Sequence, residues 1–168
     1  MLLKLFLAAV LLYAALAAAL YFAQTSIIFP SRLVPPAAPL PPGAERIELT
    51  APDGVRLEGV HIPAAPTRKS GTVILGFAGN ASNAAAIAEF LHVLYPEHAV
   101  AAFHYRGYRP SAGTPDAAAI LADAPLVHDL VRERLQPKRL VVVGISIGSG
   151  VAAGLSPQRP GDGVVLLT

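Results

Sequence analysis

The first long feature of the hydrophobic pattern is an uncharged apolar run over residues 5–23, LFLAAVLLYAALAAALYFA. A helix needs about 20 apolar residues to cross the roughly 30 Å hydrocarbon core of a bilayer, so this run predicts a transmembrane anchor within residues 1–29. A cleaved signal peptide is the alternative, because residues 17–19 are small and have the spacing that cleavage requires. The apolar stretch continues through residues 20–22 beyond that point, which favours the anchor.

The charges that flank the apolar run indicate an orientation. Lys4 and the α-amino group lie on its near side, and Arg32 is the first charge beyond it. Because positive charge is retained on the cytoplasmic side, we expect the N-terminus in the cytoplasm and the remaining chain on the extracytoplasmic side. If the run is instead cleaved as a signal peptide, the chain is expected to be secreted.

A proline-rich segment, PSRLVPPAAPLPPG, follows over residues 30–43 and contains six prolines. Proline disfavours helix interiors and central strands alike, and a run of prolines favours an extended, semi-rigid chain. We therefore expect a linker that acts as a stalk between the membrane and a domain over residues 44–168.

The pattern of this domain starts with two alternating runs, RIELT and VRLEGVHIP, on either side of a turn that contains Asp53-Gly54, which predicts a β-hairpin. Short apolar runs then alternate with longer helical stretches. This alternation is typical of an α/β fold with a mostly parallel sheet, helices on both faces and ligands at the carboxyl ends of the strands. The predicted strands are residues 72–78, 99–105, 139–144 and 163–168, and the predicted helices are residues 81–94, 115–135 and 147–155.

Composition excludes several classes of function. The 13 Lys and Arg residues are scattered along the chain and the net charge is +2, so the basic stripe of a nucleic-acid-binding surface is missing and no nucleic-acid partner is expected. The absence of cysteine excludes disulfides, a thiol nucleophile and a Cys-containing zinc site. The five histidines show no pairing at metal-ligand spacing, so we expect no metal and no cofactor.

The stretch LVVVGISIGSG, residues 140–150, places Ser146 between two glycines. Residues 144–148 fit the pattern G-x-S-x-G, which forms a nucleophile elbow where a strand precedes it and a helix follows, as predicted here. In so sharp a turn the residues two before and two after the serine approach each other, which gives Gly144 and Gly148 a steric reason to lack a side chain. The pattern therefore predicts that Ser146 is a catalytic nucleophile.

A second small-residue segment, AGNASN over residues 78–83, leads from the strand predicted at 72–78 into a helix. An elbow serine takes one oxyanion donor from the residue that follows it and the other from such a loop. The predicted oxyanion donors are therefore the backbone N–H groups of Ile147 and Asn80, with Ala81 as an alternative to Asn80.

The glycines of the elbow also fit a second pattern, G-x-x-x-G-x-G, which includes Gly150 and is found in short-chain dehydrogenases that bind a nicotinamide cofactor. That loop belongs after the first strand of its domain, whereas here a hairpin and two strand–helix units precede it. The acidic residue expected near the end of the next strand is also missing, because Asp162 precedes that strand. A nicotinamide-binding domain is therefore only an alternative to the hydrolase hypothesis.

These segments, in this order, resemble the α/β-hydrolase fold family. The resemblance is to a membrane-anchored subgroup with an N-terminal hydrophobic helix, an H-G-N-x-G-N loop, a Y-R-G-Y-G-x-S-x-G segment and a G-x-S-x-G-S-G elbow. It covers residues 24–168, with residues 105–115, YRGYRPSAGTP, as the third segment. It implies an α/β-hydrolase-type sheet after one transmembrane helix, and a serine hydrolase that cleaves ester, thioester or amide bonds with Ser146 as nucleophile.

The sequence departs from this subgroup at three positions. Ala78 stands where the loop usually begins with histidine, so a side chain that commonly braces the loop is missing while the backbone donors remain. His104 stands in place of a usual aspartate, and Arg109 in place of a usual glycine. These changes concern the geometry and charge of the loops rather than the nucleophile.

The family's catalytic triad continues, after the serine, with an aspartate or glutamate and then a histidine. After Ser146 the sequence has one carboxylate, Asp162, and no histidine, and Asp162 precedes a strand at the wrong end of the sheet. Among upstream histidines only His104 lies near the carboxyl end of a strand, either as a base or as a ring packed at that junction. His128, beside Asp129, is expected in solvent.

We therefore expect residues 44–168 to be a partial α/β-hydrolase domain, with the acid and the histidine in about two further strand–helix units that would also cover the apolar strand at 163–168. The expected reaction is acyl transfer to water through an acyl-serine, with a small-molecule or acyl substrate and with the membrane as partner through the N-terminal helix. The alternative of another class is a non-catalytic α/β-hydrolase-like protein that binds a ligand or partner.

Overall fold

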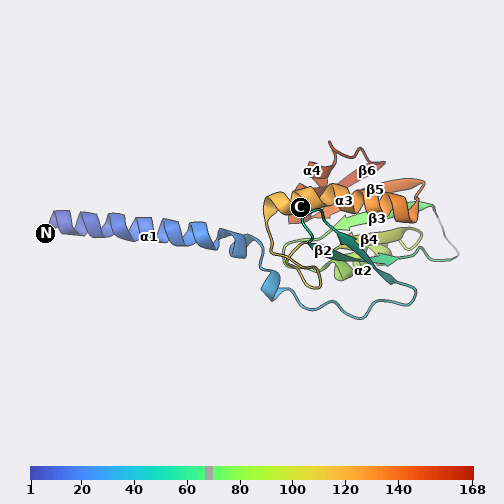
Figure 1. Ribbon diagram of the computed structural model, residues 1–168, viewed down its shortest axis with the longest axis horizontal. Helices are drawn as coiled ribbons and strands as arrows, with labels where there is room; N and C mark the ends of the chain where they lie inside the picture. Colours follow the sequence, from blue (N-terminus) through green and yellow to red (C-terminus); the bar gives the residue numbers. More distant parts are fainter. Residues whose placement is uncertain (67–69) are drawn as a thin grey trace.

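The computed structural model describes residues 1–66 and 70–168, which form one six-stranded sheet, four α-helices and a short 3₁₀-helix within that part of the chain (Figure 1). The strands are β1 (Glu45–Thr50), β2 (Arg56–Ile62), β3 (Thr72–Phe77), β4 (Ala99–Phe103), β5 (Arg139–Ile145) and β6 (Gly163–Leu167). The helices are α1 (Leu2–Ile28), η1 (Ser31–Leu33), α2 (Ala84–Leu94), α3 (Ala117–Leu135) and α4 (Ile147–Leu155).

The strands are arranged in the order β1-β2-β4-β3-β5-β6. The predicted hairpin is present as the antiparallel pair β1–β2, and β2 also runs antiparallel to β4. β3 is parallel to both of its neighbours, β4 and β5, and β5 is parallel to β6. Because the chain leaves β3 for β4 on one side and later returns to place β5 on the other, the strand order reverses at β3, where α/β sheets bind their ligands.

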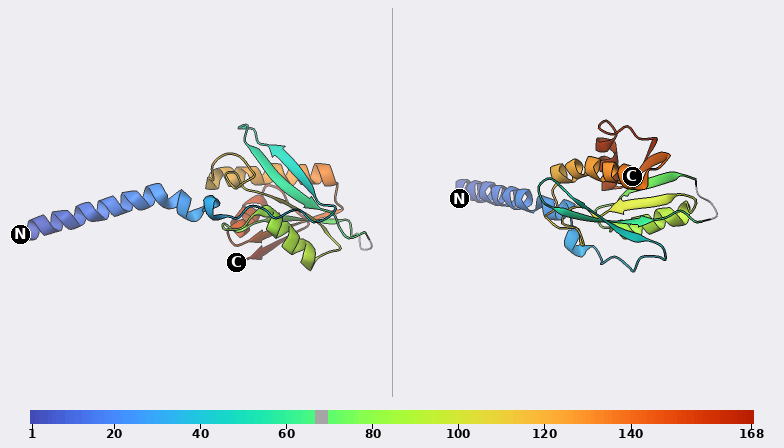
Figure 2. Two further views of the ribbon diagram at one scale, coloured as in Figure 1. Left: turned by 90° about the horizontal axis from the view of Figure 1, so that it is seen from below. Right: turned by 45° about the vertical axis from the view of Figure 1, so that its right-hand side comes forward.

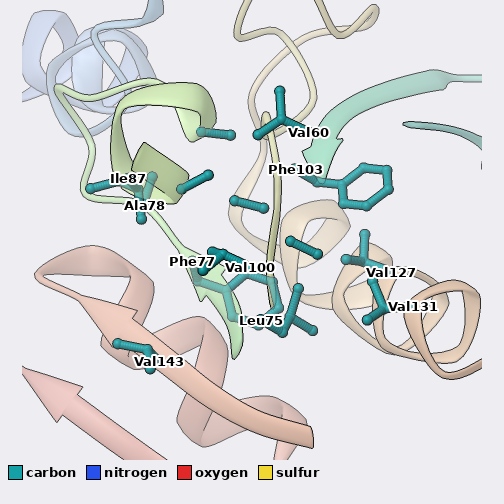
Figure 3. Packing of buried hydrophobic residues seen from close by; sticks show 14 of the residues in the cluster. Val60, Leu75, Phe77, Ala78, Ile87, Val100, Phe103, Val127, Val131 and Val143 are labelled. Atoms are coloured by element: carbon teal, nitrogen blue, oxygen red, sulfur yellow. The ribbon is translucent and has the colours of Figure 1, made fainter. Parts of the chain in front are cut away.

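Helices cover both faces of the sheet, as the alternating pattern predicted. α2 packs on β2, β3 and β4, whereas α3 and α4 pack against each other on the opposite face (Figures 1 and 2). Figure 3 shows Val127 and Val131 of α3 on one side of the strand residues Leu75 and Val100, and Ile87 of α2 on the other. Both strand side chains have no exposed surface, since their strands lie between two helical layers.

The last strand, β6, lies at the edge of the sheet and is apolar on both faces, as its sequence predicted. Its residues 164–167 are 39–47% exposed, in contrast to the buried residues of β3 and β4. Between α2 and the strands β5 and β6 lies an apolar groove, lined among others by Leu94, Val143 and Val165.

Capping side chains fix where two helices begin. α2 starts three residues later than predicted, because the Asn83 carboxamide oxygen accepts a hydrogen bond from the Ala86 N–H at 2.8 Å and so ends the preceding loop. α3 starts after Asp116, whose carboxylate accepts from the Ala119 N–H at 2.8 Å. The later start of α2 leaves residues 78–83 as a loop at the carboxyl end of β3.

α1 is long and apolar enough to cross a membrane, and none of its residues is buried against the domain. The proline-rich segment that follows is extended, as predicted for a linker, and it packs on the domain. Val34, Ala37 and Leu40 contact the core. An extended proline-rich chain has about three residues per turn, so apolar residues at every third position share one side. The domain therefore lies close to the end of α1.

Candidate active site

Ser146 is the single residue between the end of β5 at Ile145 and the start of α4 at Ile147. Its backbone has φ +54° and ψ −120°, a combination that residues with a side chain rarely adopt. The Ser146 side chain is exposed, and its hydroxyl makes no hydrogen bond with any described residue. The turn therefore presents a free hydroxyl at the carboxyl edge of the sheet.

The glycines on either side of Ser146 lie at close approaches of the backbone. A Cβ atom on Gly144 would overlap the carbonyl of Gly148, and a Cβ atom on Gly148 would overlap the carbonyl of Phe77 at the end of β3. The two glycines therefore allow the strand, the helix and the end of β3 to meet at the turn.

This crowding predicts opposite effects of two substitutions in α4. Gly148→Ala forces the Phe77 carbonyl or the helix to move, and overpacking of this kind lowers the free energy of unfolding by about 1–3 kcal/mol. Gly150→Ala meets nothing within 4 Å and is expected to raise it by about 0.5–1 kcal/mol, since alanine restricts the unfolded chain. Thermal unfolding of the two variants in detergent measures the difference, and equal stabilities would contradict the elbow geometry.

Backbone and side-chain hydrogen bonds hold the turn in place. The Ser146 N–H donates to the Leu167 carbonyl at 2.6 Å, and the Ser149 N–H donates to the Ser146 carbonyl at 2.9 Å. The buried Ser149 hydroxyl lies 3.1 Å from the carbonyl oxygens of Gly144 and Leu167. Ser149 thus joins α4 to the ends of β5 and β6, a role that the sequence pattern alone did not reveal.

The loop over residues 78–83 lies against the elbow. A Cβ atom on Gly79 would stand 3.5 Å from the Ser146 Cβ and 3.7 Å from the Ile145 carbonyl oxygen. No described residue accepts a hydrogen bond from the Asn80 N–H. The Ile147 N–H belongs to the first turn of α4, where backbone donors lack partners within the helix and the helix dipole is positive. The structure therefore brings both predicted donor segments next to the serine.

Two tyrosines hold this loop from the segment after β4. The Tyr105 hydroxyl donates to the Ala78 carbonyl at 2.8 Å, and the Tyr108 hydroxyl donates to the Asn80 carbonyl at 3.0 Å. Burial raises the pKa of Tyr108 to about 12 and also raises the pKa of Tyr105, so both phenols stay protonated and can donate. The sequence pattern identified the YRGY segment, but it did not predict that its two tyrosines bind the loop over residues 78–83.

Arg106, between these tyrosines, anchors the same segment to the domain. Its guanidinium donates to the two carboxylate oxygens of Asp123 in α3 at 2.7 and 2.6 Å, and to Asp53 at 2.8 Å. The Arg106 and Asp123 side chains are about nine-tenths buried. The loop that braces Asn80 is thus fixed to both α3 and the β1–β2 turn.

His104 is packed at the end of β4 and does not have the surroundings of a general base. It is 3% exposed, and its Nδ1 lies 3.4 Å from the Ala84 N–H at the start of α2. Burial, together with the nearby charge of Arg46, lowers the pKa of His104 to about 4. The neutral ring therefore accepts a hydrogen bond beside the loop, which agrees with the packing interpretation.

The remaining residues considered for a triad lie elsewhere. The expectation that His128 is in solvent is wrong: it is 5% exposed, and its Nδ1 lies 3.1 Å from a carboxylate oxygen of Asp129. Asp162 accepts hydrogen bonds from the Leu140 N–H and from Arg132, at the amino end of β5 and thus away from Ser146, as expected. Among residues 1–66 and 70–168, no histidine or carboxylate bonds to the Ser146 hydroxyl.

Known proteins are similar to this chain in sequence or in architecture. No protein-family model matches the chain. It is 37% identical over 132 residues to the uncharacterized protein YfhR of Escherichia coli O157:H7, covering 75% of this chain and 46% of that protein. It is 35% identical over 120 residues to the alpha/beta hydrolase domain-containing protein WAV2 of Arabidopsis thaliana, covering 69% of this chain and 39% of that protein. The chain thus spans less than half the length of these two relatives.

Among solved structures, the chain is similar to the protein XC6422 of Xanthomonas campestris, an a/b serine hydrolase without a lid. The TM-score is 0.63 at 19% sequence identity, and the match covers 77% of this chain and 63% of that one. At this identity the likeness concerns the fold, and it agrees with the mixed sheet and the helices on both of its faces. The chain therefore has an α/β-hydrolase fold, preceded by an apolar helix that is long enough to cross a membrane.

Proposed function

We propose that this chain is part of a membrane-anchored serine hydrolase that cleaves an ester, thioester or amide bond with Ser146 as its nucleophile. The observation that carries the proposal is the exposed Ser146, held at φ +54° with an unengaged hydroxyl beside the loop that contains Asn80. Strained backbone at a functional position is a known feature of active sites. The serine hydrolase named among the solved structures supports this class of reaction.

In the proposed reaction the Ser146 oxygen attacks the acyl carbon, and its proton passes to a general base. The tetrahedral oxyanion accepts hydrogen bonds from the Ile147 and Asn80 N–H groups. Collapse breaks the bond to the leaving alcohol, thiol or amine, which takes up the proton, and water then hydrolyses the acyl-serine. We propose that the base and its acid partner come from the region that corresponds to the additional length of the relatives.

Labelling with a fluorescent fluorophosphonate tests this proposal on the protein expressed from its native gene in its own membranes. We expect one covalent adduct, located on Ser146 by peptide mass spectrometry and lost in Ser146→Ala. The control Ser156→Ala changes a serine at the far end of α4 and should leave labelling intact. An unlabelled wild-type protein, or labelling that persists in Ser146→Ala, would favour the alternative of a non-catalytic binding protein.

The surroundings of Gly148 do not favour the alternative of a nicotinamide-binding domain. A glycine of that pattern must leave room for a pyrophosphate to approach the backbone. The open side of Gly148 is instead filled by the carbonyl groups of Phe77 and Ala78.

A further inference from the structure

The end of α1 is attached to the loop that carries the proposed oxyanion donor. The Asn80 side-chain amide donates a hydrogen bond to the Ile28 carbonyl, the last in α1, at 3.2 Å. The next residue, Phe29, is 8% exposed and belongs to the hydrophobic core. The helix therefore does not lead to the domain through a free tether, and its end has a fixed place beside the candidate active site.

This attachment lies at the carboxyl edge of the sheet. Figures 1 and 2 show that α1 leaves the domain at the end where α3 begins. The loop from the carboxyl end of β4 leads into α3, so this end of the domain is the carboxyl edge of the sheet. A groove of about 460 Å³ at this end is lined by Thr25 and Phe29 on one side and by Thr114 and Pro115 on the other. The edge that presents Ser146 is thus the one that faces the α1 end of the molecule.

The length of α1 places this edge close to a bilayer. The uncharged apolar run ends at residue 23, and Ile28 lies five residues further, about 7–8 Å at the helical rise of 1.5 Å per residue. A bilayer is about 40–45 Å thick with headgroups and about 30 Å without, so each headgroup layer is roughly 5–8 Å deep. The Asn80 loop therefore lies at the outer boundary of the headgroup layer when α1 spans the membrane.

The surface beside the attachment has the side chains of a membrane interface. In η1, Arg32 is exposed and Leu33 is 81% exposed, and Ile27 at the end of α1 is 60% exposed. Arg109, in the loop after β4, is exposed as well. At a membrane surface the cationic groups can bind lipid phosphates while the apolar side chains contact the upper part of the acyl chains. In water the same apolar side chains would remain exposed to solvent.

From this arrangement we infer that the site of Ser146 opens onto the membrane surface and that its substrate is a lipid ester of the adjoining leaflet. The inference rests on the proposed hydrolase function for the reaction, and on the fixed end of α1 for the substrate class. A lipid that rises slightly from the headgroup layer brings its acyl carbonyl to the edge that carries Ser146 and Asn80. A soluble ester has to reach the same edge through the space between the domain and the membrane.

The position of the edge is tested without any catalysis. Because the chain has no cysteine, Thr114→Cys at the groove and Lys138→Cys before β5 each give a single fluorophore attachment site. β5 separates the two ends of the sheet by about 20 Å, at 3.3 Å per residue. In vesicles with nitroxide-labelled phosphatidylcholine headgroups, we expect several-fold stronger quenching at position 114. Equal quenching, or stronger quenching at 138, would overturn the inference.

The substrate class is tested with two fluorophosphonates that differ only in chain length, on the protein in the same vesicles. We expect the long-chain, bilayer-resident probe to label Ser146 at least ten-fold faster than the short, soluble one. A flexible Gly-Ser spacer between Gln24 and Thr25 should remove this preference and the quenching contrast but keep labelling by the soluble probe. Absence of labelling by both probes contradicts the hydrolase proposal alone, since the quenching result still decides the geometry.

Hydrolysis of a phospholipid ester in vesicles is the third test. Vesicles that contain a fluorogenic phospholipid ester should be hydrolysed by the wild type and not by Ser146→Ala. Hydrolysis of an acylated membrane peptide in place of the lipid, or a soluble probe that reacts as fast as the bilayer-resident one, would overturn the assignment of a lipid substrate.

Discussion

Ser146→Gly is expected to abolish hydrolysis and yet to make the protein more stable. Loss of the elbow nucleophile lowers kcat on the order of a million-fold in enzymes of this mechanism. The Ser146 backbone, at φ +54° and ψ −120°, is strained for a residue with a Cβ atom, and such strain costs about 1–3 kcal/mol. Glycine removes the strain but gains about 0.5–1 kcal/mol of unfolded-state entropy, so we expect a net gain in the free energy of unfolding of roughly 1 kcal/mol.

Ser146→Ala is the matched control for this prediction. It loses the same hydroxyl, and with it the same activity, but it retains the Cβ atom and therefore the strain. Thermal unfolding of both variants in detergent, alongside the fluorophosphonate assay, separates the two effects. If the glycine variant is less stable than the alanine variant, the turn at Ser146 is not strained and the geometric argument for a nucleophile elbow fails.

The elements of the domain were predictable because polar and apolar residues alternate in the hairpin, and apolar runs then alternate with helical stretches. Alternation located β1 and β2, and the apolar runs located β3 to β6, since parallel strands covered on both sides are apolar on both faces. The pattern also located the turn at Ser146, since only glycine fits the two close approaches beside it. Strands and sharp turns can thus be predicted from the local sequence, without knowledge of the tertiary structure.

The contacts that support the site were not predictable in the same way. The bonds from Tyr105 and Tyr108 to the Asn80 loop, and the bond from Asn80 to α1, join residues 27, 28 and 52 positions apart. Nothing in the local pattern selects one such partner among many. The burial of His128 was missed for the same reason, because the face of α3 that becomes covered depends on how distant elements assemble around it.

The proline-rich segment shows how far composition alone determines the course of a chain. Its prolines exclude an α-helix and a central strand, and the structure has neither there, although the short 3₁₀-helix η1 forms at the start of the segment. They do not determine whether the extended chain stands free, and apolar residues at every third position allow it to lie on the domain. This difference matters for function, because it holds the candidate active site close to the end of α1 rather than at a variable distance from it.

Asp123→Ala is expected to have the largest effect on folding. Its carboxylate and the Arg106 guanidinium form a bidentate pair in which both side chains are about nine-tenths buried. Removal of one partner of a buried pair costs about 3–5 kcal/mol, because the remaining charge loses its compensation. Asp53, which also bonds to Arg106, offsets part of this cost, so we expect a loss in the free energy of unfolding near the lower end of that range.

Arg159→Ala provides a control at an exposed pair and leaves the contact between Asp129 and the buried His128 in place. Arg159 forms a bidentate pair with Asp129 at 2.7 and 2.6 Å, but both side chains are 40–47% exposed. Water screens such a pair, so its loss is expected to change stability far less. Unfolding by denaturant in detergent measures both variants. Equal effects would show that burial of the Arg106–Asp123 pair does not determine its contribution, and that the loop carrying Tyr105 and Tyr108 is held in place by other contacts.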